Sequence, residues 1–149
     1  MIQIRNNVFE TNSSMTHCLV MCDKTKYDKW AAGEMMFKMN GHQFTDNASA
    51  RKFNAYHLRK NLKIWQEYGR YIDDPVLNED TIQKYENGEY KDNHWGLFAR
   101  WDIDDYFITF EQWNDYIDSI GMEEIRDTSK ILVDDKLVDI IGFGYYGHD

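Results

Sequence analysis

The sequence predicts a single α+β domain over residues 1–149, with a mainly antiparallel sheet, one long helix and several short helices. Three observations favour this class. Short runs of alternating or β-branched residues recur along the chain, as they do in strands. Residues 48–68 carry one continuous helical stripe of apolar side chains. The one proline, Pro75, follows two aspartates, a break typical of a loop rather than of a linker between domains.

The first half of the chain alternates between strand and helix patterns. Residues 1–9, 16–21 and 35–39 predict strands, and residues 24–32 predict a short helix. The long helix has polar capping residues before it and Gly69 after it as a stop. Its buried face is predicted from four apolar residues at helical spacing, Ala55, Leu58, Leu62 and Trp65.

The second half of the chain is richer in acidic residues and turns. Residues 78–87 predict a short acidic helix, and residues 95–101 predict a strand. We expect a polar loop after Gly121. Beyond it, residues 131–133 and 137–141 predict a hairpin around a turn of two aspartates and a lysine.

The stretch of residues 101–121 combines a strand end with a capped helix. Residues 106–108 are aromatic or β-branched, which is typical of a strand. Thr109 can cap the helix that follows, with Gln112 completing a capping box. Gly121 comes just after the last periodic residue and predicts the end of that helix.

This predicted helix has an apolar side and an acidic side. Glu111, Asp115 and Asp118 fall on one side at i, i+4, i+7 spacing. Like charges four residues apart destabilise a helix by roughly 0.2–0.5 kcal/mol per pair, and Asp118 lies where the helix dipole disfavours an anion. An acidic side kept at such a cost indicates a docking face for a cationic partner. The opposite side is formed by Phe110, Trp113, Ile117 and Ile120.

Charge is divided unequally between the two halves of the chain. The net charge is −9. Residues 1–72 hold 11 basic and 6 acidic residues, a net of +5, whereas residues 73–149 hold 6 basic and 20 acidic residues, a net of −14. This asymmetry favours a charged partner, but it also fits solubility combined with attraction inside the chain, and both interpretations stay open.

The acidic residues have a spacing compatible with an imitation of DNA. Carboxylates on one helix face step by roughly 4.5–6 Å, against about 3.4 Å per phosphate along one DNA strand. A protein that binds DNA through lysine and arginine presents the complementary field. Tyr106, Trp113 or Tyr116 would supply aromatic anchors where exposed. The predicted partner-binding set is Asp102, Asp104, Asp105, Glu111, Asp115, Asp118, Glu123 and Glu124.

The long helix offers an alternative surface opposite its buried face. Cations interleaved with a tyrosine suit nucleic-acid phosphates, although the acidic remainder of the chain would repel the same polymer. We therefore interpret this face first as pairing with an acidic surface, in the same chain or across a homodimer, and second as a nucleic-acid site. Its residues are Lys52, Tyr56, Arg59 and Lys63.

The sequence contains patterns that resemble cofactor and metal motifs, but the residues around them do not fit such sites. Residues 142–147 spell G-x-G-x-x-G, but only two residues follow for the helix that dinucleotide binding requires. Residues 102–105 lack the glycine and closing glutamate of a calcium loop, although a loose divalent-ion site there stays open. In a strand, Cys18 and Cys22 would lie about 13 Å apart, too far for one zinc ion, even with His17 nearby. We expect no metal and no cofactor.

No residue stands out as a catalytic nucleophile. Cys18 follows His17 directly, but neighbours in a strand point to opposite faces, so their adjacency is poor evidence for a nucleophile–base pair. Ser13 and Ser14 offer no better case. We assign no catalytic residue, and a small metal-dependent enzyme remains the third hypothesis.

The opening segment of residues 5–17, RNNVFETNSSMTH, resembles the start of small proteins from phages and mobile elements of low-GC Gram-positive bacteria. Met15 and Cys18 depart from the serines of that pattern. The resemblance implies a phage setting, in which small acidic proteins often inhibit host defence as anti-restriction or anti-CRISPR proteins. The chain has no apolar run of membrane-spanning length and no leader pattern, so we expect it in the cytoplasm of the infected host, as a non-enzymatic inhibitor of a defence nuclease.

Overall fold

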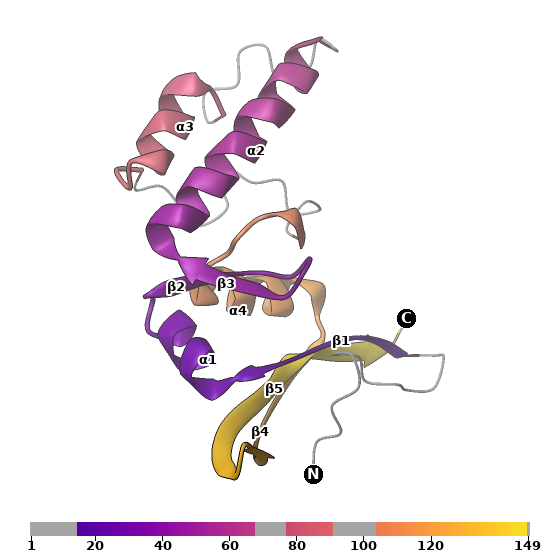
Figure 1. Cartoon of the computed structure of the whole chain (residues 1–149). Helices are drawn as coiled ribbons and strands as arrows, with labels where there is room; N and C mark the ends of the chain where they lie inside the picture. The colour runs from indigo at the N-terminus through magenta and orange to yellow at the C-terminus, as the bar shows by residue number, and fades with distance from the viewer. Residues whose placement is uncertain (1–14, 68–76, 91–103, 149) are drawn as a thin grey trace.

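The structure, a computed structural model, describes residues 15–67, 77–90 and 104–148. Within these ranges it has the predicted α+β class, with four helices and five strands (Figure 1). The helices are α1 (Lys24–Ala31), α2 (Asn47–Glu67), α3 (Glu79–Glu86) and α4 (Phe110–Ile120). The strands are β1 (Met15–Asp23), β2 (Met35–Lys38), β3 (Gln43–Asp46), β4 (Glu123–Val133) and β5 (Lys136–His148).

Most described elements form where the sequence predicts them. The ends of β1, α1, β2 and α3 differ from the prediction by one or two residues. The short strand β3 has no predicted counterpart. The predicted strands over residues 1–9 and 95–101, and the end of the long helix at Gly69, lie outside the described residues. Across the described parts of the chain, no helix is both long enough and apolar enough to cross a membrane.

The strands form two antiparallel sheets rather than the one sheet predicted. One has the order β1-β5-β4, and the other pairs β2 with β3. Figure 1 shows α2 and α3 at one end of the molecule, the three-stranded sheet at the other, and β2, β3 and α4 between them. The strand end predicted over residues 106–108 is a single bridge from Ile108 to Phe37 of β2.

β4 replaces the polar loop predicted after Gly121. It pairs along all of its 11 residues with β5, and the hairpin turns at Asp134 and Asp135. Both turn residues have positive φ, 49° and 64°, as a type I′ hairpin requires. The hairpin itself is therefore confirmed, but its second strand runs on to His148 instead of ending at residue 141, because residues 142–148 pair with β1. β4 escaped prediction because it is an edge strand with mostly exposed, polar side chains, which lack the apolar alternation of a half-buried strand.

An aromatic cluster around Trp30 forms the core beside the three-stranded sheet. Trp30 is fully buried, and its indole Nε1 donates a hydrogen bond to the Ile108 carbonyl at 3.1 Å. Six aromatic rings from α1, β2, β3, α4 and β5 lie with their centroids 5.0–5.9 Å from the Trp30 ring. This packing holds α4 against the sheet. The six residues are Tyr27, Phe37, Phe44, Phe110, Trp113 and Phe143.

Gly144 allows β1 and β5 to pair closely. A Cβ atom at this position would lie 1.8 Å from the backbone oxygen of Cys18, a distance that no side chain can adopt. Gly144 therefore serves strand packing. The G-x-G-x-x-G pattern of residues 142–147 lies inside β5, where it forms no helix N-terminus for a pyrophosphate.

α2 is attached to the rest of the molecule by a buried asparagine. The Asn54 side chain donates to the Phe107 carbonyl and accepts from the Phe107 amide, both at 2.8 Å, so it takes the place of a neighbouring strand. The same amide group donates to the Tyr85 hydroxyl on α3 at 2.8 Å. Beside it, α2 and α3 share a mostly aliphatic core that includes the predicted residues Ala55, Leu58 and Leu62, together with Leu77 and Ile82. The side chain of the fourth predicted residue, Trp65, lies outside the described part of the structure.

Candidate partner-binding surface

α4 has the caps and the two sides that the sequence predicts. The Thr109 side chain accepts a hydrogen bond from the Gln112 amide, and the Gln112 side chain accepts one from the Thr109 amide. Gly121 ends the helix in the left-handed conformation, with φ of 68°. Trp113 and Ile117 are buried. Because the apolar side is fixed in the core, the acidic side has one defined orientation.

The acidic side of α4 faces away from the core. Glu111 and Asp118 are exposed, and Asp115 is half-buried. After the turn that ends α4, β4 begins with Glu123 and Glu124, which are both exposed. Five of the eight predicted partner-binding carboxylates therefore lie on two consecutive elements.

The first residues of β4 are held by neighbours in the same half of the chain. Glu123 accepts a hydrogen bond from the hydroxyl of Tyr146 on β5. Glu124 forms an ion pair with Arg126 of its own strand, and the Arg126 guanidinium lies 5.7 Å from the ring centre of Tyr27. These contacts fix the direction of both carboxylates, and Arg126 offsets part of their charge.

Asp104 and Asp105 lie beside the turn between β2 and β3. Asp105 accepts a hydrogen bond from the Asn40 side chain at 2.6 Å, and the Asp104 carbonyl accepts one from the Asn40 amide at 3.1 Å. The pKa of Asp104 is raised mainly by burial and also by the negative charge of Asp105. The pKa of Tyr116 on α4 is raised mainly by burial and also by the negative charge of Asp104, so Asp104 acts electrostatically on α4. The other predicted carboxylate of this group, Asp102, lies outside the described residues.

The three predicted aromatic anchors belong to the scaffold. Tyr106 and Trp113 are 2% and 1% exposed, so neither is available to a partner. Tyr116 is half-buried, with its ring centre 6.1 Å from that of Tyr145. These rings support the surface from behind.

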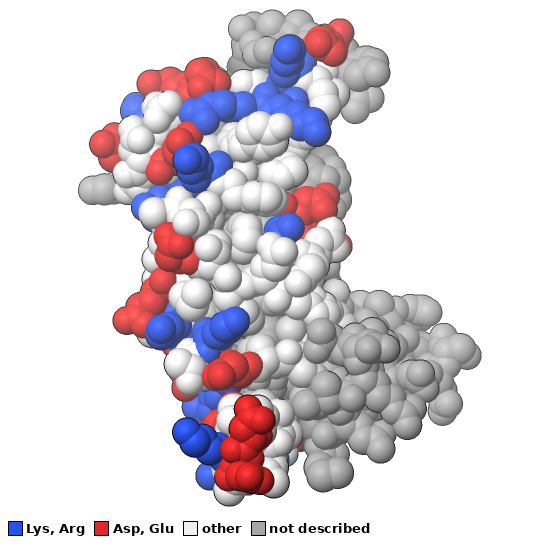
Figure 2. Space-filling view, viewed as in Figure 1, with Lys and Arg blue, Asp and Glu red and all other residues white. Residues whose placement is uncertain are grey.

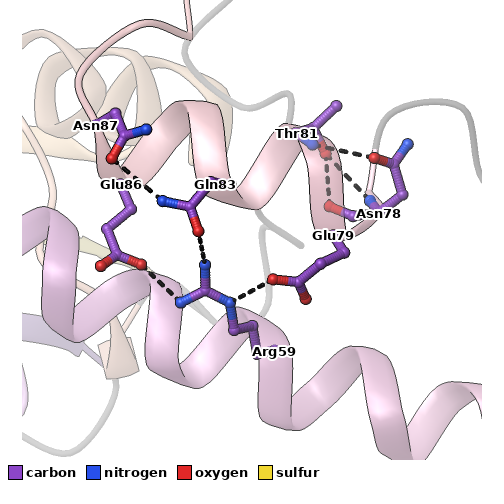
Figure 3. A network of polar contacts seen from close by, with 7 residues as sticks. All are labelled: Arg59, Asn78, Glu79, Thr81, Gln83, Glu86 and Asn87. Carbon is purple, nitrogen blue, oxygen red and sulfur yellow. Dashed lines mark hydrogen bonds and ion pairs between the residues drawn. The ribbon is translucent and has the colours of Figure 1, made fainter.

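The basic face of α2 is partly used within the chain. Arg59 donates to Glu79 at 2.8 Å, to Glu86 at 2.6 Å and to Gln83 at 3.0 Å, all on α3 (Figure 3). Hydrogen bonds to the two glutamates raise the pKa of Arg59. Figure 2 shows basic side chains along α2 next to acidic side chains of α3. For Arg59, the structure thus agrees with the first interpretation, pairing within the chain.

The other residues of the basic face remain on the surface. Lys52 and Lys63 are exposed, and Tyr56 is 65% exposed. These two lysines and the tyrosine form an exposed row that is accessible for the alternative function, nucleic-acid binding.

Both cysteines are protonated thiols at neutral pH. Cys18 and Cys22 are half-buried in β1, and burial is the main cause that raises their pKa values to about 11 and about 12. A thiol is a weak nucleophile and a poor metal ligand compared with a thiolate. In the described ranges, no three His, Cys, Asp or Glu side chains are grouped so that they could hold a metal ion.

A cavity of about 530 Å³ opens between β1, β3 and the start of α1. Burial lowers the pKa of His42 in its wall, so the imidazole is neutral at pH 7. With Cys22 as a protonated thiol beside it, the cavity presents no activated nucleophile, and we assign it no chemistry. It is lined by Met21, Cys22, Asp23, Lys26, His42, Gln43, Phe44, Thr45 and Phe107.

The residues that sequence reasoning missed lie at the end of the β4–β5 hairpin. Leu132, Val133 and Leu137 are 66%, 45% and 69% exposed. In the sequence these residues are visible as a cluster of apolar side chains on either side of a two-aspartate turn. Strand periodicity alone predicts that such side chains are buried in a core. Only the position of the hairpin end, away from the packed layers, places them on the surface.

Comparison of the chain with known protein families, characterised proteins and solved structures finds no match. The case for a partner-binding surface therefore rests on the chemistry of the described residues. The acidic surface of α4 and β4, defined here as Glu111, Asp115, Asp118, Glu123 and Glu124, has the most defined geometry among the candidates.

Proposed function

We propose that the protein is a non-enzymatic inhibitor of a host defence nuclease, of anti-CRISPR or anti-restriction type. The acidic surface of α4 and β4, together with Asp104 and Asp105, would occupy the DNA-binding cleft of that nuclease. The observation that carries the proposal is the orientation of α4. Its apolar side is locked into the aromatic core, so Glu111 and Asp118 are exposed on a rigid scaffold.

Electrostatics supports this assignment. Carboxylates held on a fixed scaffold need little reorganisation to meet a cationic groove, and their field accelerates association. α4 keeps its three acidic residues although i, i+4 repulsion opposes Glu111 and Asp115 and the helix dipole opposes Asp118. Arg59 joins the two oppositely charged halves of the chain through Glu79 and Glu86, which are outside the proposed surface.

The resemblance of residues 5–17 to the start of phage and mobile-element proteins supports a phage setting for this function. An inhibitor of this kind would act in the cytoplasm of the infected bacterium, where its target binds DNA. The partner would be a nuclease or another DNA-binding defence protein, recognised through its lysines and arginines.

Cleavage of DNA by a panel of purified CRISPR and restriction nucleases from Gram-positive bacteria tests the proposal. We expect the wild-type protein to inhibit at least one nuclease of the panel. A variant with three charge reversals should lose the inhibition, because the surface would then repel the cationic cleft. The reversals are Glu111→Lys, Asp115→Lys and Asp118→Lys.

A matched variant controls for net charge. It carries three reversals of exposed glutamates elsewhere and should inhibit like the wild type, with circular dichroism showing that both variants are folded. Full inhibition by the α4 variant, or no inhibition of any nuclease by the wild type, would count against the proposal. The control reversals are Glu34→Lys, Glu67→Lys and Glu89→Lys.

A second candidate function is nucleic-acid binding by the basic face of α2. The observation that favours it is the exposure of Tyr56, 65%, on the same helix as the exposed Lys52 and Lys63. A mobility-shift titration of DNA and RNA separates the two proposals. A DNA mimic leaves the nucleic acid unshifted, whereas a binding protein shifts it with an affinity that falls steeply with salt.

A further inference from the structure

The end of the β4–β5 hairpin presents apolar side chains on both of its faces. Leu132 and Leu137 are direct cross-strand partners and are 66% and 69% exposed. Since side chains alternate along a strand, the two leucines share one face, and Val133, which is 45% exposed, lies on the other. Single exposed leucines are common on proteins, but an exposed pair beside a projecting turn forms a contiguous contact surface.

The turn that joins the two strands is acidic and strained. Asp134 and Asp135 both have positive φ, a conformation that an Asn-Gly pair adopts at lower cost. Two aspartates therefore add negative charge where hairpin formation does not require it. Neither side chain forms an ion pair or hydrogen bond with another residue in the described part of the chain. Figure 2 shows acidic side chains at this end of the molecule with basic side chains next to them, and the exposed Lys130 and Lys136 lie on the two strands beside the turn.

Charge and area indicate what this hairpin end can contact. The turn aspartates and the net charge of −9 would repel a second copy of the chain. Two leucines and a valine also cover far less than the roughly 1,000 Å² that a stable interface needs, so they suit an anchor within a larger contact. The complementary partner surface is an apolar pocket with lysine or arginine around its rim.

We propose that the hairpin end docks into such a pocket on a basic protein partner. Leu132 and Leu137 would fill the pocket, and Asp134 and Asp135 would meet its cationic rim. β4 covers about 27 Å between Glu124 and Leu132 at about 3.4 Å per residue, so this contact is separate from the acidic surface of α4 and β4. The basic character of the partner rests on the proposed function, whereas the anchor rests on the geometry of the hairpin.

A peptide titration tests the anchor without knowledge of the partner. The probe is a 14-residue amphipathic helix of leucine and lysine, added to the full-length ¹⁵N-labelled protein and followed by NMR. We expect the largest amide shifts in residues 130–139, and an affinity at least about tenfold weaker when Leu132→Ser and Leu137→Ser are combined. Asp134→Asn with Asp135→Asn should reduce the salt dependence of binding.

The matched control removes an exposed apolar side chain from α2, Ile64→Ser, and should leave peptide affinity unchanged. Three results would contradict the proposed anchor. They are an absence of peptide binding, amide shifts confined to α4, and a Leu132→Ser, Leu137→Ser variant that binds the peptide as tightly as the wild type. Peptide binding at the hairpin by a protein that inhibits no nuclease would overturn the proposed function and leave the anchor standing.

Discussion

The sheet region and the α2–α3 region of this molecule are stabilised by different forces. Around Trp30, aromatic rings from five elements pack against one another beside the paired backbones of the β1-β5-β4 sheet. In the α2–α3 region, a smaller and mostly aliphatic core is accompanied by side-chain polar contacts: Asn54 and Arg59 bond to α3, and Asn61 bonds to the Tyr106 hydroxyl. Aromatic side chains therefore form the core at one end of the molecule, whereas at the other end side-chain hydrogen bonds and the ion pairs of Arg59 accompany the apolar core.

This difference bears on function. A surface meant to present charges in a fixed pattern needs a scaffold that salt does not perturb, which aromatic packing provides. α4, with the proposed acidic surface, is built into that scaffold through Trp113 and Phe110. Salt should act instead on the contacts of Arg59 with α3.

Removal of the Trp30 side chain should have the largest effect on stability. Trp30→Ala leaves a cavity surrounded by six rings and is expected to lower the free energy of unfolding by about 3–5 kcal/mol. Urea denaturation followed by circular dichroism measures this loss. Tyr56→Ala, at an exposed aromatic residue, should change stability by less than about 0.5 kcal/mol. Equal effects of the two substitutions would contradict a core centred on Trp30.

Asn54 tests the polar attachment of α2. Asn54→Ala leaves the buried amide and carbonyl of Phe107 without partners, so we expect a loss of about 2–4 kcal/mol. Asn61→Ala removes a single hydrogen bond to the Tyr106 hydroxyl and should cost about 1 kcal/mol. Hydrogen exchange should show faster exchange of the Phe107 amide in the Asn54 variant. An unchanged exchange rate would show that the asparagine does not hold this segment.

Arg59 should separate the two regions by their response to salt. Arg59→Gln removes two ion pairs at a partly exposed site and is expected to cost about 1 kcal/mol at low ionic strength. The cost should shrink in 1 M salt, because screening weakens the pairs in the wild type. Lys52→Gln, an exposed control on the same helix, should have little effect at either salt concentration. A cost of the Arg59 change that is independent of salt would assign it to packing instead.

Acidification should weaken the fold through two histidines, one in each region. Burial lowers the pKa values of His42 and His57 below their ordinary value, so the unfolded chain binds protons more readily than the folded protein. Stability should therefore fall as pH decreases from 7.5 to 5.5. Thermal unfolding of the wild type and of a variant with His42→Asn and His57→Asn measures the effect, which should be smaller in the variant. A wild type that gains stability over this range would contradict the sign.

Local signals in the sequence predict the capped elements and the hairpin well. Thr109, Gln112 and Gly121 define α4 because caps depend on neighbouring residues. β4 could not be predicted from its residue pattern, because a strand at the edge of a sheet does not need alternating apolar side chains. The role of Asn54 could not be predicted, because its partner Phe107 lies 53 residues away.

For the candidate site, periodicity correctly places the acidic side of α4 outside the core, but it cannot say what binds there. The exposure of Leu132 and Leu137 depends on where the hairpin ends in space, which no local pattern encodes. The choice of the acidic surface as a partner-binding site therefore remains a prediction.

Competition with DNA for a nuclease tests the central claim most directly. A labelled DNA duplex is bound to a nuclease that the protein inhibits, and its displacement is followed by fluorescence anisotropy as the protein is added. We predict that the wild type displaces the DNA, with an apparent affinity that weakens as DNA concentration rises, and that the variant with reversed Glu111, Asp115 and Asp118 displaces none. Inhibition without displacement, or displacement by the reversed variant, would contradict a DNA-mimicking surface on α4.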